Sequence, residues 1–221
     1  DLRAGYNIGG TMPMGMPASI RSLDAYRPTL SVMLGLGVYK PLTDKWGLTT
    51  GLRLENKGID IDATVKNYHM KIVRGGQELE GMYTGNVSTE VIEWMFTVPV
   101  MATYHIGSRW RIHAGPYVSL LTQKSFEGRA HNGYLRVGTP TGAKVNIGDD
   151  VSTSGTYDFS SNMRRFQWGV AAGADWRAFK RWGFFAELKW GLSGIHKSDF
   201  HTIEQTLYPI FGSAGIIYKL R

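Results

Sequence analysis

The stretch Trp182-Gly183-Phe184-Phe185-Ala186-Glu187-Leu188-Lys189-Trp190 alternates between two kinds of side chain. Apolar residues occupy the even positions, whereas Glu187 and Lys189 occupy odd positions. Successive side chains of a β-strand point to opposite faces, so this pattern predicts a strand with one apolar face and one charged face. Tryptophan at both ends of the apolar face is typical of a strand that crosses an apolar layer between two polar boundaries.

The same alternation recurs along the whole chain. Each segment that carries it is about as long as the ~9 to 11 residues that a tilted strand needs to cross a hydrocarbon core. The predicted strands are residues 2–11, 29–40, 46–57, 94–106, 110–121, 164–176, 182–193 and 206–220.

The links between these strands alternate between short and long. The short links, residues 41–45, 107–109 and 177–181, suit tight reversals. The long links are residues 12–28, 58–93, 122–163 and 194–205. This arrangement predicts a single domain, residues 1–221, that forms an all-β, eight-stranded antiparallel up-and-down barrel with both termini beside the short turns. Links 58–93 and 122–163 are long for structureless loops, so we expect them to extend the strands or to be functional.

Tryptophan identifies which face of the barrel is outside. Soluble barrels bury their apolar face, so alternation alone does not settle the question. Every tryptophan lies on the apolar face near a strand end, in two groups that form predicted membrane-interface girdles. Trp46, Trp110, Trp176 and Trp182 flank the short turns, and Trp94, Trp168 and Trp190 lie toward the long links. The apolar face is therefore predicted to contact lipid, with short periplasmic turns and long extracellular loops.

The composition agrees with this interpretation. The 221 residues include no cysteine, which excludes disulfides and thiolate sites. No apolar run approaches the ~20 residues of a transmembrane helix. The net charge of +7 does not distinguish nucleic acid, anionic lipid and a solvated surface as its cause. Because no signal peptide precedes Asp1, we expect that any export signal was removed before this numbering begins.

The odd face carries glycines and charges, which suits a narrow, filled lumen and not a wide pore. We predict an internal network of ion pairs and hydrogen bonds. Positive charges outnumber carboxylates on this face, so some basic groups should reach water at the rims. The predicted network is Arg53, Glu55, Lys57, Arg111, Arg165, Asp175, Glu187 and Lys189.

Four strand segments stand out by their order and spacing. They are Arg3-Ala4-Gly5-Tyr6-Asn7-Ile8, Phe96-Thr97-Val98-Pro99-Val100-Met101-Ala102-Thr103-Tyr104, His113-Ala114-Gly115-Pro116-Tyr117-Val118 and Gly215-Ile216-Ile217-Tyr218-Lys219-Leu220. Together they resemble the PorT-like outer-membrane β-barrel family of Bacteroidetes. The resemblance implies a small eight-stranded barrel, similar in size to OmpA and OmpX, that is exported by a signal peptide to the bacterial outer membrane. The family's namesake takes part in protein secretion. The chain ends in Leu220-Arg221, where outer-membrane strands commonly finish on an aromatic residue.

One histidine raises an enzymatic alternative. His196 and Ser198 at the barrel rim resemble the base and nucleophile of outer-membrane lipid A deacylases, with Asp199 or Glu204 as the orienting acid. The alternative is that these residues are simply the polar beginning of the last long loop and have no catalytic role.

Other candidate sites are weaker. His105 and His113 could bind a metal, although a hydrogen-bonded pair suits them better. Asp60, Asp62, Asp149 and Asp150 could bind a hard cation or simply be solvated. Residues 138–144 lack the spacing of a phosphate loop.

The leading hypothesis is a non-enzymatic outer-membrane barrel whose extracellular loops bind a protein, a glycan or a neighbouring membrane complex. We expect the lipid bilayer and lipopolysaccharide as its surroundings, and no cofactor, metal or nucleic acid. The alternatives are a lipid A hydrolase and a soluble barrel that carries a small hydrophobic ligand. Loop residues that suit partner contacts are the cluster at 12–17 and Tyr68, Tyr83, Tyr134 and Tyr157.

Overall fold

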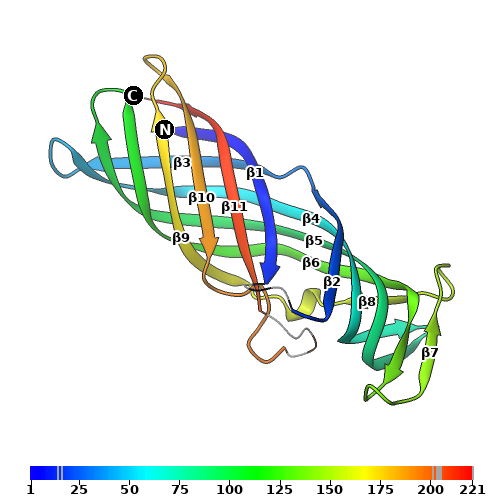
Figure 1. Ribbon diagram of the computed structural model, residues 1–221. Helices are drawn as coiled ribbons and strands as arrows, with labels where there is room; N and C mark the ends of the chain where they lie inside the picture. The colour runs from blue at the N-terminus through cyan, green and yellow to red at the C-terminus, as the bar shows by residue number, and fades with distance from the viewer. Residues whose placement is uncertain (14, 16, 201, 203–205, 221) are drawn as a thin grey trace.

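A computed structural model describes residues 1–13, 15, 17–200, 202 and 206–220. Within this part of the chain, eight antiparallel strands close into a ring in the order β1-β3-β4-β5-β6-β9-β10-β11, which confirms the predicted barrel. Both termini and the short turns lie at one end (Figure 1). The helices of the described residues are too short to span a membrane.

The ring strands differ greatly in length. The strands near the predicted lengths are β1 (Leu2–Pro13), β3 (Val32–Pro41), β9 (Phe166–Trp176), β10 (Trp182–Gly191) and β11 (Leu207–Tyr218). The long strands are β4 (Trp46–Arg74), β5 (Gln77–Ile106) and β6 (Trp110–Val137). β11 closes the ring because it pairs with β1 along its full length, from Leu2 opposite Tyr218 to Pro13 opposite Leu207.

The long strands continue past the barrel and build a second body, the distal arm. It consists of residues 58–74 of β4, 77–92 of β5 and 124–137 of β6, together with β2 (Ile20–Pro28), β7 (Lys144–Ile147), β8 (Gly155–Asp158) and the 3₁₀ turn η1 (Ser160–Asn162). β2 pairs with β4, β7 pairs with β6, and β8 bridges β6 and β4. Figure 1 shows the arm leaving the barrel at the end opposite the termini.

The two faces of β4 exchange character where the barrel ends. Just before the barrel ends, the inward side chains Arg53, Glu55 and Lys57 are charged and the outward Leu52 and Leu54 are apolar. Beyond Lys57, Ile59 turns inward and is buried, while Asp60 lies on the outer face. The strand has no register shift between Arg53 and Val65, so the exchange marks the level at which lipid gives way to water.

Three links therefore differ from open loops, since residues 122–163 contain the rest of β6 together with β7, β8 and η1. Residues 58–93 form a continuous hairpin from β4 to β5, as expected for strand extension. Residues 12–28, expected to be a loop, instead contain the end of β1 and the whole of β2. β2 forms because β4 extends beyond the start of β3 and presents a free edge there.

Candidate functional site

The barrel lumen is crossed by ion pairs between strands that are far apart in the sequence. Near the short turns, Arg3 donates to both carboxylate oxygens of Asp175 at 3.1 and 2.8 Å. Arg111 donates to the same carboxylate at 2.9 Å and lies 3.4 Å from Asp1. Two guanidinium groups thus share one buried acid, which satisfies several of its lone pairs.

A second group of charges fills the middle of the lumen. Arg53 donates to Glu187 in a bidentate pair at 2.5 and 3.1 Å, and His113 Nε2 lies 3.0 Å from the same carboxylate. Lys189 donates to Glu55, whose other oxygen lies 3.4 Å from the hydroxyl of Thr97. Because these residues come from β4, β5, β6 and β10, the network ties opposite walls together.

The far end of the lumen is closed by a smaller set of contacts. Gln167 donates to Glu93 at 2.8 Å, and the Lys57 ammonium lies 4.9 Å from the centroid of the Phe211 ring. Ser213 donates to Asn7 at 2.6 Å. Polar side chains with partners therefore occupy the barrel interior along its length, as is usual for an eight-stranded barrel.

The expected network requires one correction. Arg165 precedes β9 and is exposed at the rim, because the chain enters the strand only at Phe166. The structure brings the other predicted members into the lumen and adds Arg3, His113, Asp1 and Glu93. Among the side chains of the described residues, five carboxylates then face five cations in the lumen: Asp1, Glu55, Glu93, Asp175 and Glu187 against Arg3, Arg53, Lys57, Arg111 and Lys189.

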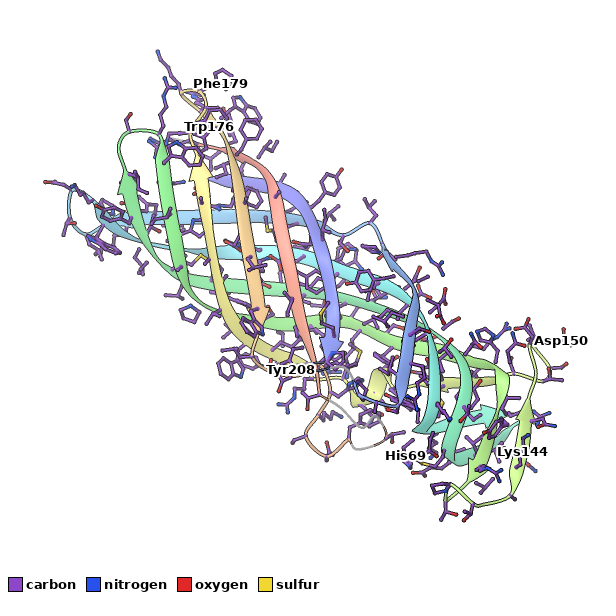
Figure 2. All side chains as sticks on the ribbon, in the orientation of Figure 1. His69, Lys144, Asp150, Trp176, Phe179 and Tyr208 are labelled. Atoms are coloured by element: carbon purple, nitrogen blue, oxygen red, sulfur yellow. The ribbon has the colours of Figure 1, made fainter. Side chains whose placement is uncertain are left out.

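The predicted girdle tryptophans all lie on the outer wall. Six are exposed and Trp94 is half-buried. Trp176 stands at the short-turn end in Figure 2, beside the exposed Phe179. Trp110 stacks on Trp176 at 6.0 Å, and Trp182 packs on Tyr218 at 4.8 Å. A belt of exposed rings bounding a wall of exposed aliphatic residues suits a lipid interface.

His196 and Ser198 do not form a catalytic pair among the described residues. The His196 ring lies 4.9 Å from the Phe126 ring and 4.8 Å from the Phe200 ring, and its Nε2 is buried without a described hydrogen-bond partner. Burial, reinforced by the charge of Lys124, lowers the pKa of His196 to about 4. Ser198 is exposed, and no described hydrogen bond joins it to the imidazole. Asp199 is also exposed, and Glu204 lies outside the described residues.

The other proposed metal ligands are dispersed. His105 Nε2 lies 2.9 Å from the Tyr39 hydroxyl, whereas His113 Nε2 lies 3.0 Å from the Glu187 carboxylate. Asp62 pairs with Arg27, and Asp149 pairs with Arg129 at 3.2 Å. Within the described part of the chain, no cluster of three or more His, Cys, Asp or Glu side chains is arranged for a metal ion. Residues 138–143 form the turn between β6 and β7.

The distal arm has an apolar core of its own. Its buried members include Ile72, Leu135 and Tyr83, whose hydroxyl donates to the carbonyl of His131 at 2.6 Å. Tyr157 is buried as well, and burial raises its pKa to about 12. Tyr83 and Tyr157 were expected to offer loop contacts, but both are core residues. Tyr83 lies on the inward face of β5, whose buried residues Met95, Glu93, Val91 and Tyr83 all occupy odd positions, and Tyr157 enters the core from β8.

The far end of the arm is polar and exposed. Lys144 and Asp150 project from it in Figure 2. Tyr134 is half-buried between two cations, with the Lys144 ammonium 4.4 Å and the Arg136 guanidinium 5.8 Å from its ring centroid. Tyr68 faces an apolar cavity, as does Met12 of the predicted 12–17 cluster, whereas Met14 and Met16 lie outside the described residues. The far end of the arm therefore combines an aromatic ring, Tyr134, with the charges of Lys144 and Arg136.

Comparison with known proteins supports the membrane interpretation. The model of the outer membrane protein beta-barrel domain matches residues 1–197. The match ends before β11, the strand that completes the ring. A search of curated proteins finds no match.

Proposed function

Because the chain belongs to the outer membrane protein beta-barrel domain family and its setting is the bacterial outer membrane, we propose that it is a binding protein that presents the distal arm to an extracellular partner. The barrel anchors the chain in the bilayer, and the short turns face the periplasm. The partner is a protein, a glycan or a neighbouring membrane complex that contacts the exposed end of the arm.

The proposal rests on the length of the arm and on its paired strands and buried core. β4, β5 and β6 have 29, 30 and 28 residues, although about 9 to 11 suffice to cross the hydrocarbon core. The excess is paired strand around a buried core and not open loop. A rigid scaffold lowers the entropy lost when a surface binds a partner. Membrane anchorage alone gives no reason to fold such a structure.

Site-specific photocrosslinking in the native outer membrane tests the proposal. A photoreactive residue at Lys144 or Asp150 should give discrete adducts, whereas the same residue at Phe179, an exposed position at the opposite end of the barrel, should not give the same adducts. Adducts would be separated by mass and identified as protein or glycan. Folded, surface-exposed protein that gives no adduct from the arm would contradict the proposal.

We further propose that the chain is not an enzyme. The contacts of His196 support this, because its ring is enclosed by Phe126 and Phe200 and an enclosed base does not activate Ser198. Mass spectrometry of lipid A incubated with the folded barrel, beside a Ser198→Ala control, gives the test. Deacylation that disappears in the control would establish the hydrolase instead.

Within its family, we propose a PorT-like affiliation and hence a link to secretion or adhesion. The order and spacing of four strand motifs, from Arg3-Ala4-Gly5 to the closing Gly215-Ile216-Ile217, support it. Deleting the gene and comparing the proteins released to the medium would test the secretory role. An unchanged set of secreted proteins would count against it.

A further inference from the structure

An apolar cavity of about 250 Å³ lies where the distal arm meets the barrel. β4 contributes Ile61, Ala63 and Val65 to its wall, and β5 contributes Val87 and Val91. No charged side chain lines it among the described residues. In other proteins, an apolar cavity of about 150 Å³ remains dry and binds benzene. The larger cavity described here therefore suits a somewhat larger apolar group.

The wall of the molecule is interrupted beside this cavity. β1 pairs with β3 only from Leu2 to Tyr6, while β2 pairs with β4 from Ile20 to Pro28. In the described chain, residues 8–13 of β1 have no strand ladder on the side toward β2. Figure 1 shows β2 standing apart from the end of β1. We call this interruption the β1/β2 seam.

Apolar side chains surround the cavity where it meets the seam. Met12, Leu23 and Tyr26 line it and remain 44%, 48% and 38% exposed. Tyr26 spans the seam, because a Cβ placed on Gly10 would lie only 1.6 Å from the Tyr26 hydroxyl oxygen. Exposed apolar residues around an apolar cavity mark a place where an apolar molecule can enter.

The seam lies at the outer boundary of the membrane. Met12 is paired with Tyr208, which belongs to the level of the outer aromatic girdle. Just below, Ile8 and Leu30 are 68% and 76% exposed on the wall that faces lipid. The β1/β2 seam therefore adjoins the region where acyl chains end and headgroups begin.

We propose that the β1/β2 seam admits a single alkyl chain of an amphiphile into this cavity, with the polar head left outside at the membrane surface. The neutral lining excludes a charged group, and the volume admits one chain and not a whole lipid. The site is separate from the barrel lumen, which is filled by ion pairs, and from the polar end of the arm. It does not depend on the partner proposed above.

Photolabelling in lipid nanodiscs tests the site with two probes. One is a free long-chain alcohol that carries a diazirine on its alkyl chain, and the other is a phosphatidylcholine with the same diazirine on one acyl chain. Adducts would be mapped by peptide mass spectrometry. Labelling of Met70 or Val91, which line the cavity and are buried, reports the cavity, whereas labelling of Leu36 and Leu52 reports lipid contact with the outer wall.

Filling the cavity provides the decisive comparison. Ala63→Phe should reduce cavity labelling by roughly tenfold or more, since each methylene excluded from an apolar site weakens binding several-fold. Labelling of the outer wall should not change. Leu52→Phe, on the lipid face, is the matched control and should preserve cavity labelling. Ala63→Leu, a smaller intrusion, should give an intermediate loss if Ala63→Phe does not fold.

The two probes distinguish a free amphiphile from a membrane lipid as the source of the bound alkyl chain. Labelling by the alcohol alone identifies a free amphiphile, and labelling by the phosphatidylcholine identifies a membrane lipid; either result supports the site. If neither probe labels the cavity peptides, or if folded Ala63→Phe and Ala63→Leu proteins are labelled as strongly as the parent, the proposal is overturned.

Discussion

Arg53 on β4 and Glu187 on β10 are 134 residues apart in the sequence and form a buried bidentate ion pair across the lumen. Both side chains are almost completely buried, at 5% and 0% exposure. The pair therefore links two walls of the barrel and makes each charge dependent on the other.

Removing one member of this pair should destabilise the barrel strongly. Glu187→Ala leaves the Arg53 guanidinium buried without its partner, at a cost of about 3–5 kcal/mol in the free energy of unfolding. Urea titration followed by the mobility difference between unboiled and boiled protein measures the loss. The double variant Arg53→Met/Glu187→Met should recover much of it, because no lone charge remains. Equal stability of Glu187→Ala and the parent would show that the pair is unimportant.

Closure of the ring depends on Gly215. A Cβ at this position would lie 2.1 Å from the carbonyl oxygen of Ala4 and 2.5 Å from the Cα of Gly5, both backbone atoms of β1. Because backbone in a closed ring cannot retreat freely, Gly215→Ala should sharply reduce the heat-modifiable fraction on refolding. Gly212→Ala on the same strand is the control, since its Cβ would meet only the Ile8 carbonyl oxygen at 3.6 Å. Equal refolding of the two variants would contradict this account.

An arginine that replaces an exposed apolar residue should destabilise the barrel wall much more than it destabilises the arm. Leu52 is exposed on the barrel wall between the two girdles, whereas Val151 is exposed in the turn between β7 and β8. Leu52→Arg places a charge in lipid and should cost about 2–4 kcal/mol. Val151→Arg places it in water and should change the free energy of unfolding by less than about 0.5 kcal/mol. Urea unfolding in lipid vesicles measures both, and equal costs would refute the assignment of the wall to lipid.

The barrel can be predicted because the two faces of each strand meet different surroundings. Lipid outside requires apolar residues and the narrow lumen inside takes glycines and charges, so a strand such as β10 can be recognised from the sequence alone. Only the ends were inaccurate. Arg165 continued the alternation by parity, but the strand begins one residue later.

The arm is harder to predict from the sequence, because the alternation of β4 and β6 changes phase within it. A register shift between Val65 and Tyr68, with Asn67 at a φ of 53°, moves the buried set from odd to even positions of β4. Another shift in β6, opposite Trp94 and Met95, does the same there. A bulge inserts one residue and leaves no strong sequence signal. Tyr83 and Tyr157 fall in links 58–93 and 122–163, which the sequence predicts as loops, so neither their burial nor the cavity follows from the sequence.

Acid should loosen the packing around His196. Folding lowers the pKa of this imidazole from its ordinary value near 6.5 to about 4, chiefly by burial between Phe126 and Phe200, with Lys124 opposing a second positive charge. Arg164 adds another cation nearby, as its Nε donates to the His196 carbonyl at 2.6 Å.

The direction of the pH effect follows from proton binding. Between pH 6.5 and 4 the unfolded segment binds a proton that the folded segment excludes, so the stability of the folded packing falls as pH decreases through this window. The loss amounts to about 3 kcal/mol at most. Hydrogen exchange of residues 194–200, corrected for intrinsic rates, should accordingly rise from pH 7 to pH 4.5. His196→Phe retains the ring contacts without a titrating group, so its corrected exchange should be independent of pH. If that variant showed the same acid response as the parent, the response would have to come from another group.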